Sequence, residues 1–237
     1  MAEVFFNGPA GRIEGKLAES NNPKAPIAIV LHPHPQFGGT MNNKVVYNIY
    51  KTLFENDFTV LRINFRGVGR SLGEYDGGVG EMTDAATALD WIQTNYPMSK
   101  VNLLAGFSFG AWIAMQLIMR RPEITNFIAV APPVNKYDFS FLSPCPIPGL
   151  ILQGDKDSVV SEESVHELAQ RLTKQKNIDV AYRVINNADH FFREKIDSLN
   201  EEIDDYLKAI FSHQIGKAAG KNDKGQTKTE VKKVFLI

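Results

Sequence analysis

The chain has 237 residues, of which 43% are hydrophobic and 22% charged, a composition that suits one sizeable α/β domain with a substantial core. The formal net charge of −1 excludes the basic balance that would indicate nucleic acid as a partner and the acidic excess typical of disordered chains. A single cysteine, Cys145, excludes an internal disulfide. Residues 1–8 do not resemble a signal peptide, and no apolar run reaches about 18 residues, so we expect a cytoplasmic protein without a membrane span that acts on a small molecule.

Short apolar segments and helical patterns alternate along the chain. Turn residues at 7–11 predict an antiparallel hairpin of two edge strands, 3–6 and 12–18. The pattern predicts further strands at 27–31, 58–65, 101–105, 127–131, 149–153 and 179–185, and helices at about 43–56, 83–95, 111–119, 161–174 and 193–211. Strands that alternate with helices in this way indicate an α/β fold with a doubly wound, mostly parallel sheet in three layers.

Two segments bear on domain organisation. The proline-rich segment 132–148 is too short to hold a helical lid between two strands, so we expect an open site bounded by loops. Residues 213–237 carry many lysines and lack a core pattern. We therefore expect a single domain over 1–212 and a flexible, lysine-rich tail over 213–237.

A sharp turn between the strand at 101–105 and the helix at 111–119 is the feature that points to chemistry. It reads Gly106-Phe107-Ser108-Phe109-Gly110. Such a turn forces strained backbone angles on the serine, and the flanking glycines remove Cβ atoms that would collide with the strand or the helix. Its hydroxyl would stand at the positive end of a helix, where negative charge that develops during acyl transfer is favoured. This pattern is typical of a nucleophile elbow and predicts Ser108 as a nucleophile.

A serine nucleophile needs a histidine base that a carboxylate orients. His190 follows the last predicted strand, where loops gather at the carboxyl edge of the sheet, and we predict it as the base. Asp157 follows the strand at 149–153 and is our preferred carboxylate. Asp155 competes but is better placed to accept local backbone hydrogen bonds, and Asp189 is too near its own histidine in the chain.

The oxyanion of a tetrahedral intermediate needs two preorganised donors. The N–H of Phe109 is one, and the second is expected from the loop after the strand at 27–31. Because Pro33 and Pro35 have no N–H, this donor must be His34, Gln36 or a later residue, and His34 is our first choice.

Two other readings of these loops are weaker. His32 and His34 have the spacing of a metal pair, but no further ligand follows at a suitable spacing, and we predict no metal and no cofactor. The segment 66–71 faintly suggests a phosphate-binding loop. It lacks the lysine of a P-loop and the spacing of a dinucleotide fingerprint, so we expect a structural turn there.

With these motifs identified, residues 20–212 resemble the α/β-hydrolase superfamily. The resemblance rests on the His-Pro-His-Pro motif at 32–35, the Gly-Gly-Thr-Met motif at 38–41, the segment 64–71 and the elbow at 106–110, which together are similar to small lidless bacterial serine hydrolases. The superfamily usually has His-Gly where this chain has His32-Pro33. The chain also resembles dienelactone hydrolases in size, but those have cysteine at the elbow. The resemblance implies an α/β-hydrolase fold with Ser108, His190 and Asp157 as a triad.

The leading hypothesis is a serine hydrolase that cleaves a small carboxylic ester or thioester through an acyl-enzyme on Ser108. A peptidase or an acyltransferase would use the same residues. A non-catalytic binding or scaffold protein on the same fold is the alternative from a different class. The sequence leaves a homodimer open.

Overall fold

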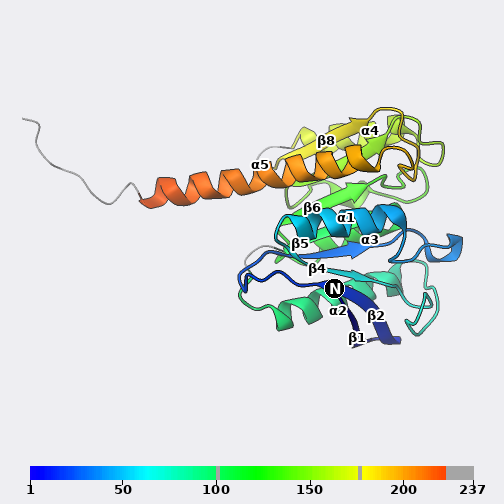
Figure 1. Cartoon of the computed structure of the whole chain (residues 1–237). Helices are drawn as coiled ribbons and strands as arrows, with labels where there is room; N and C mark the ends of the chain where they lie inside the picture. Colours follow the sequence, from blue (N-terminus) through cyan, green and yellow to red (C-terminus); the bar gives the residue numbers. More distant parts are fainter. Residues whose placement is uncertain (100–101, 176–177, 223–237) are drawn as a thin grey trace, which may run out of the picture.

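One eight-stranded sheet organises the protein in the computed structural model, which describes residues 1–99, 102–175 and 178–222 (Figure 1). The strand order is β1-β2-β4-β3-β5-β6-β7-β8. The strands are β1 Ala2–Gly8, β2 Gly11–Ala18, β3 Ile27–Leu31, β4 Thr59–Ile63, β5 Asn102–Phe107, β6 Asn126–Val130, β7 Gly149–Gly154 and β8 Val180–Ile185. The β1–β2 hairpin joins β4 in antiparallel fashion, and every other pair is parallel. The predicted fold class is confirmed.

Helices cover both faces of the sheet. They are α1 Lys44–Glu55, α2 Val79–Asn95, α3 Phe109–Ile118, α4 Glu162–Thr173 and α5 Ile196–Asn222. One apolar core lies between the sheet and α1 with α5, and the other lies between the sheet and α2, α3 and α4. The central strands are buried over their whole length because both faces are covered, which explains their continuous apolar sequence. No described helix is both long and apolar enough to cross a membrane.

Two helices differ from the boundaries that periodicity predicts. α2 begins at Val79 rather than Thr83, because the Glu81 carboxylate turns back and accepts the N–H groups of Asp76 and Gly78, at 3.0 and 2.7 Å. This contact starts the helix inside a glycine-rich stretch, where there are too few apolar residues for a hydrophobic pattern to predict the first turn.

The last helix, α5, begins at Ile196 rather than Arg193 and ends at Asn222 rather than Phe211. A hydrogen bond from the N–H of Arg193 to Asp189 holds the residues before it in a turn. The final part of α5 falls within the segment 213–237 for which the sequence predicts a flexible tail. Residues 223–237 lie outside the described residues, so the domain boundary stays a prediction.

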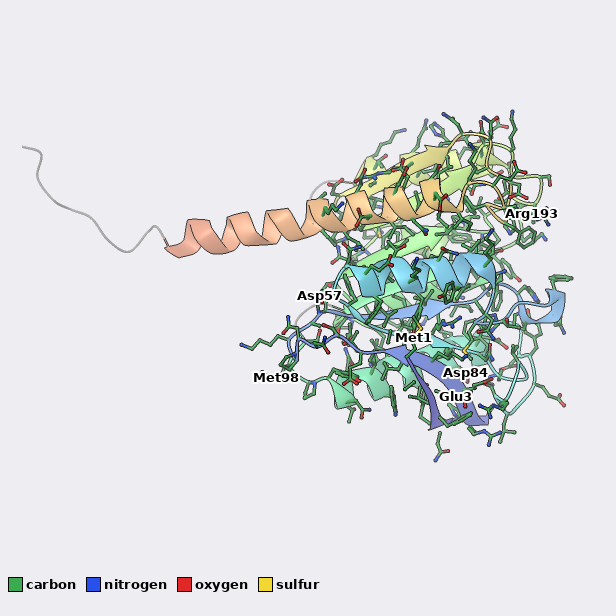
Figure 2. All side chains as sticks on the ribbon, viewed as in Figure 1. Met1, Glu3, Asp57, Asp84, Met98 and Arg193 are labelled. Carbon is green, nitrogen blue, oxygen red and sulfur yellow. The ribbon has the colours of Figure 1, made fainter. Side chains whose placement is uncertain are left out.

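The carboxyl ends of the parallel strands meet at one edge of the molecule. Arg193, which follows β8, lies at the opposite end from Asp57 and Met98, which precede β4 and β5 (Figure 2). Between β6 and β7 the chain forms a short 3-10 helix at Ser140–Leu142 and no α-helix. The prediction of a fold without a lid is therefore confirmed.

Candidate active site

The elbow places Ser108 between β5 and α3 without an intervening loop. Ser108 has φ 52° and ψ −117°, a combination that costs a non-glycine residue of order 1–3 kcal/mol. Its N–H donates to the carbonyl of Val130 in β6 at 2.8 Å, which ties the turn to the neighbouring strand. The strained backbone that the sequence predicts is present.

Both elbow glycines are required by close backbone contacts. A Cβ atom on Gly106 would lie 2.3 Å from the carbonyl group of Gly110, and one on Gly110 would lie 2.4 Å from the carbonyl oxygen of Leu31. Neither neighbour is a flexible side chain, so a larger residue would have to move β3 or α3. The two glycines therefore let the turn pack directly against the end of β3.

A buried carboxylate and imidazole meet beside the elbow. Asp157, in the loop after β7, and His190, in the loop after β8, are 33 positions apart in sequence, yet His190 Nδ1 lies 2.7 Å from Asp157 Oδ2. Both side chains are almost fully buried. Because a carboxylate oxygen only accepts, the pairing assigns the Nδ1–H as the donor, and among the described residues no hydrogen bond engages Nε2.

Asp157 is held by four hydrogen bonds. Oδ1 accepts the N–H groups of Val159 and Val160, each at 2.8 Å, and Oδ2 also accepts an N–H of the Gln153 amide at 3.1 Å. Burial raises the pKa of this carboxyl, but the hydrogen bond and charge of His190 and the two backbone donors outweigh it and leave the pKa below its ordinary value. Asp157 is therefore a fixed carboxylate.

The two rival carboxylates are engaged elsewhere. Asp155 is exposed, and its Oδ1 accepts the N–H of Asn187, which follows β8, at 2.6 Å. It accepts a backbone N–H as expected, but not one from its own turn, where Asp157 accepts the N–H groups of Val159 and Val160. Asp189 accepts the N–H of Arg193 and pairs with the guanidinium of the same residue at 3.1 Å. Neither carboxylate is directed to His190, so Asp157 is the carboxylate that pairs with it.

A cavity of about 370 Å³ opens above the elbow and brings the predicted residues together. Ser108, Phe109, His34 and His190 all line it. Its remaining walls come from loops after β3, β6, β7 and β8, through Pro33, Phe37, Gly38, Gly39, Asn43, Pro133, Lys136, Tyr137, Val159 and Phe191. Asp157 lies behind His190 rather than on the wall.

The loop after β3, residues 32–43, is tightly folded, and we call it the β3 loop. Its N–H groups at 36, 37, 38 and 39 donate within the loop, to His34 Nδ1, to the His34 carbonyl, to the Pro35 carbonyl and again to the His34 carbonyl. Across the described residues, no backbone or side-chain acceptor receives the N–H of His34 or that of Phe109. Two unpartnered donors thus belong to residues that line the cavity beside Ser108.

His32 has a structural role. It is fully buried, its Nδ1–H donates to the carbonyl of Pro33 at 2.6 Å, and its Nε2 accepts the N–H of Phe65 at 3.0 Å. With both ring nitrogens engaged, His32 cannot join His34 in a metal pair. The pKa of His32 is lowered to about 4, chiefly by burial; the bond to Pro33 opposes this lowering, and the nearby His34 adds to it.

Because His32 is buried, we expect the protein to lose stability in acid. Its pKa is about 4 in the folded chain against 6.5 when solvated, so between these values the unfolded chain takes up the proton and the folded chain does not. The free energy of unfolding therefore falls as the pH drops, by about 2 kcal/mol between pH 7 and pH 4.5 from this residue. Urea titrations at both pH values measure it. A His32→Gln variant should lose less than wild type over this interval, while the exposed control His166→Gln should follow wild type; equal losses in all three would contradict the assignment.

The segment 66–71 is a structural turn. The Arg66 guanidinium pairs with both oxygens of buried Asp84 on α2, at 2.8 and 3.0 Å. A Cβ atom on Gly69 would lie 2.4 Å from the Asn64 amide and 2.5 Å from the Glu14 carboxylate. The arginine is thus neutralised and the turn is filled by its own neighbours, which does not suit a phosphate.

A buried polar network that sequence reasoning missed supports the β3 loop. Asn64 accepts the N–H of Met41 at 2.8 Å and donates to Glu14 of β2 at 2.7 Å. Arg62 donates to the carbonyl of Met41 at 2.6 Å, so the Met41 peptide groups are held from both sides. The available signal was the presence of Arg62 and Asn64 in and just after an otherwise apolar strand.

Comparison with known proteins agrees with this architecture. Residues 29–146 match the family described as alpha/beta hydrolase fold. A protein of unknown function from Agrobacterium tumefaciens has a similar crystal structure, with 54% identity, a TM-score of 0.87 and coverage of 90% of this chain and 97% of that one. An α/β serine hydrolase homologue from Coxiella burnetii shares 37% identity with a TM-score of 0.81, over 87% of this chain and 97% of that one. An α/β serine hydrolase without a lid from Xanthomonas campestris shares 31% identity with a TM-score of 0.79, over 88% and 94%. The chain belongs to the α/β-hydrolase superfamily.

Proposed function

We propose that the protein is a serine hydrolase that cleaves a small carboxylic ester or thioester through an acyl-enzyme on Ser108. The observation that carries the proposal is the buried 2.7 Å hydrogen bond between Asp157 and His190, beside a cavity that His190 shares with the strained Ser108. The relatives from Coxiella and Xanthomonas, which are described as serine hydrolases or their homologues, support the same class.

Each residue has a role that follows from its contacts. Because His190 Nδ1 is engaged by Asp157, its Nε2 is the nitrogen that takes the proton from the Ser108 hydroxyl as this oxygen attacks the carbonyl carbon. His190 then returns the proton to the leaving alcohol or thiol. A water molecule, deprotonated by the same nitrogen, attacks the acyl carbon; the bond from this carbon to Ser108 Oγ breaks, the proton passes from His190 to that oxygen, and the acid is released. Asp157 stabilises the imidazolium that forms in each step.

The N–H groups of Phe109 and His34 are the proposed donors to the oxyanion. The hydrogen bonds within the β3 loop favour His34 over Gln36 as the donor, because the N–H of Gln36 already donates to His34 Nδ1. The Phe109 N–H is at the first position of α3, where a helix leaves its N–H groups without partners. Oriented backbone donors of this kind are each worth about 10²–10³ in kcat.

Active-site labelling tests the proposal directly. A fluorophosphonate should react covalently with wild type, and mass spectrometry after trypsin digestion should place the adduct on the peptide 101–120, which contains Ser108. The same preparation should hydrolyse p-nitrophenyl acetate, and labelling should abolish that turnover. A folded wild-type protein that neither reacts nor turns over the ester would refute the proposal and favour a non-catalytic member of the fold.

A further inference from the structure

The cavity carries a single kind of formal charge on its walls. Lys136, in the turn after β6, contributes an ammonium group, and among the described residues that line the cavity none is an aspartate or glutamate. Two buried acids adjoin lining residues: Asp157 is hydrogen-bonded to His190, and Glu81, near His34, has its carboxylate occupied by the N–H groups of Asp76 and Gly78. A ligand in this cavity therefore meets a cation that no lining carboxylate neutralises.

The ammonium of Lys136 is not paired elsewhere. Within the described parts of the chain no carboxylate oxygen lies within 4.0 Å of its Nζ. Asp138, two residues along, is directed to Ser140 instead, accepting its N–H at 2.8 Å and its hydroxyl at 2.7 Å. Lys136 Nζ lies 5.9 Å from the ring centroid of Phe37, across the cavity mouth on the β3 loop.

The backbone that carries Lys136 is firmly held. Its N–H donates to the carbonyl of Pro133, and the amide of Asn135 donates to the carbonyl of Val159 at 2.9 Å. The ring of Tyr137 stacks on Trp112 of α3, with centroids 4.1 Å apart. A flexible side chain on a fixed base can reach a ligand group at the mouth without ordering a loop.

Around this cation the mouth is apolar and aromatic. Phe37 is 79% exposed, and Phe191 and Val159 are also exposed at the cavity rim. The β3 loop that carries Phe37 projects from the edge of the molecule in Figure 1. Such a surface fits a ligand with an apolar body that lies against the rings and an anionic group that pairs with the ammonium.

We propose that the substrate is an anionic ester or thioester and that Lys136 selects it. Its acyl or its alcohol part would be an apolar chain that bears a carboxylate. This inference rests on the proposed function. The scissile carbonyl would lie at Ser108, and the carboxylate at the cavity mouth would accept a hydrogen bond from Lys136. Lys136 thus determines specificity and takes no part in bond making.

Two matched pairs of substrates test the inference and distinguish which side of the ester carries the charge. Monoethyl adipate is compared with ethyl hexanoate for a carboxylate on the acyl chain, and 4-acetoxybutanoate with butyl acetate for one on the alcohol. In at least one pair, wild type should show a higher kcat/KM for the anionic member. Lys136→Met should lower that kcat/KM by about fivefold, in line with a partly exposed ion pair, and should change the neutral member by less than about twofold. Lys136→Glu should lower it further.

The control is Lys24→Met, which removes an exposed lysine at the amino end of β3, away from the cavity, and should behave as wild type. Raising the salt concentration should reduce the preference of wild type for the anionic ester and leave its neutral activity unchanged. If neutral esters are hydrolysed and labelling succeeds, but Lys136→Met affects charged and neutral esters equally, the inference is wrong and the proposed function stands. If no ester is hydrolysed and no label is taken up, both fail.

Discussion

Replacing Ser108 with alanine is expected to lower kcat for p-nitrophenyl acetate by about 10⁶-fold, to the rate left by binding and the oxyanion donors alone. The hydroxyl oxygen is the atom that would form the acyl-enzyme, and alanine has no group to take its place. The fold should survive, because the cavity side of the residue is open and the N–H bond to Val130 is kept. Stopped-flow or long-time absorbance assays at 405 nm measure the loss.

The matched control for this variant is Ser198→Ala on α5, outside the cavity, which should retain wild-type turnover and labelling. Circular dichroism and a thermal unfolding curve check that Ser108→Ala is folded. Fluorophosphonate labelling should disappear in Ser108→Ala alone. A folded Ser108→Ala protein that still hydrolyses the ester within tenfold of wild type would show that another residue is the nucleophile.

Asp157→Asn is expected to lower kcat by about 10⁴-fold with little change in KM. The introduced amide can keep its oxygen on the N–H groups of Val159 and Val160, and this places its NH₂ against His190 Nδ1 and the Gln153 amide, where two donors would meet. His190 then moves its proton to Nε2 to relieve the conflict. With Nε2 protonated, the imidazole cannot accept the proton of Ser108.

Asp155→Asn is the matched control, because it makes the same change two residues away on an exposed carboxylate that accepts the backbone N–H of Asn187 and does not contact His190. It should remain within a few-fold of wild type. The activity of Asp157→Asn should also recover in part as the pH rises, since hydroxide then assists deprotonation of the serine. Equal effects of the two asparagine variants would show that the contact between Asp157 and His190 does not orient the base.

The fold and the grouping of Ser108, Asp157 and His190 could be predicted because few elements determine them. Parallel strands bring their carboxyl ends to one edge. Polar residues that follow β5, β7 and β8 therefore gather at that edge, whatever the details of helix packing. The preference for Asp157 over Asp155 agrees with the contact to His190, but the local rule behind it does not hold, because Asp157 itself accepts the nearby N–H groups of Val159 and Val160. Asp155 accepts the N–H of Asn187 after β8, a long-range contact that the sequence does not reveal. Their catalytic roles stay a prediction.

The walls of the cavity could not be predicted in the same way. Lys136 and Phe37 lie in loops without periodicity, and their approach depends on how two separate turns fold over the sheet edge. The early start of α2 depends likewise on one carboxylate that caps two N–H groups, and the support of Met41 by Arg62 and Asn64 depends on side-chain hydrogen bonds. Each of these is a long-range or side-chain contact that hydrophobic patterning does not encode.

The short segment between β6 and β7 has a consequence for the fate of a covalent intermediate. With a 3-10 turn where a helical cover could stand, water could reach an acyl group on the elbow, and a competing alcohol or amine would have to be held in place to react first. Transfer to another acceptor would need that acceptor to be bound, or water to be excluded by some other part of the chain. If Ser108 forms an acyl-enzyme as proposed, the lack of a helical cover between β6 and β7 favours its hydrolysis to the free acid.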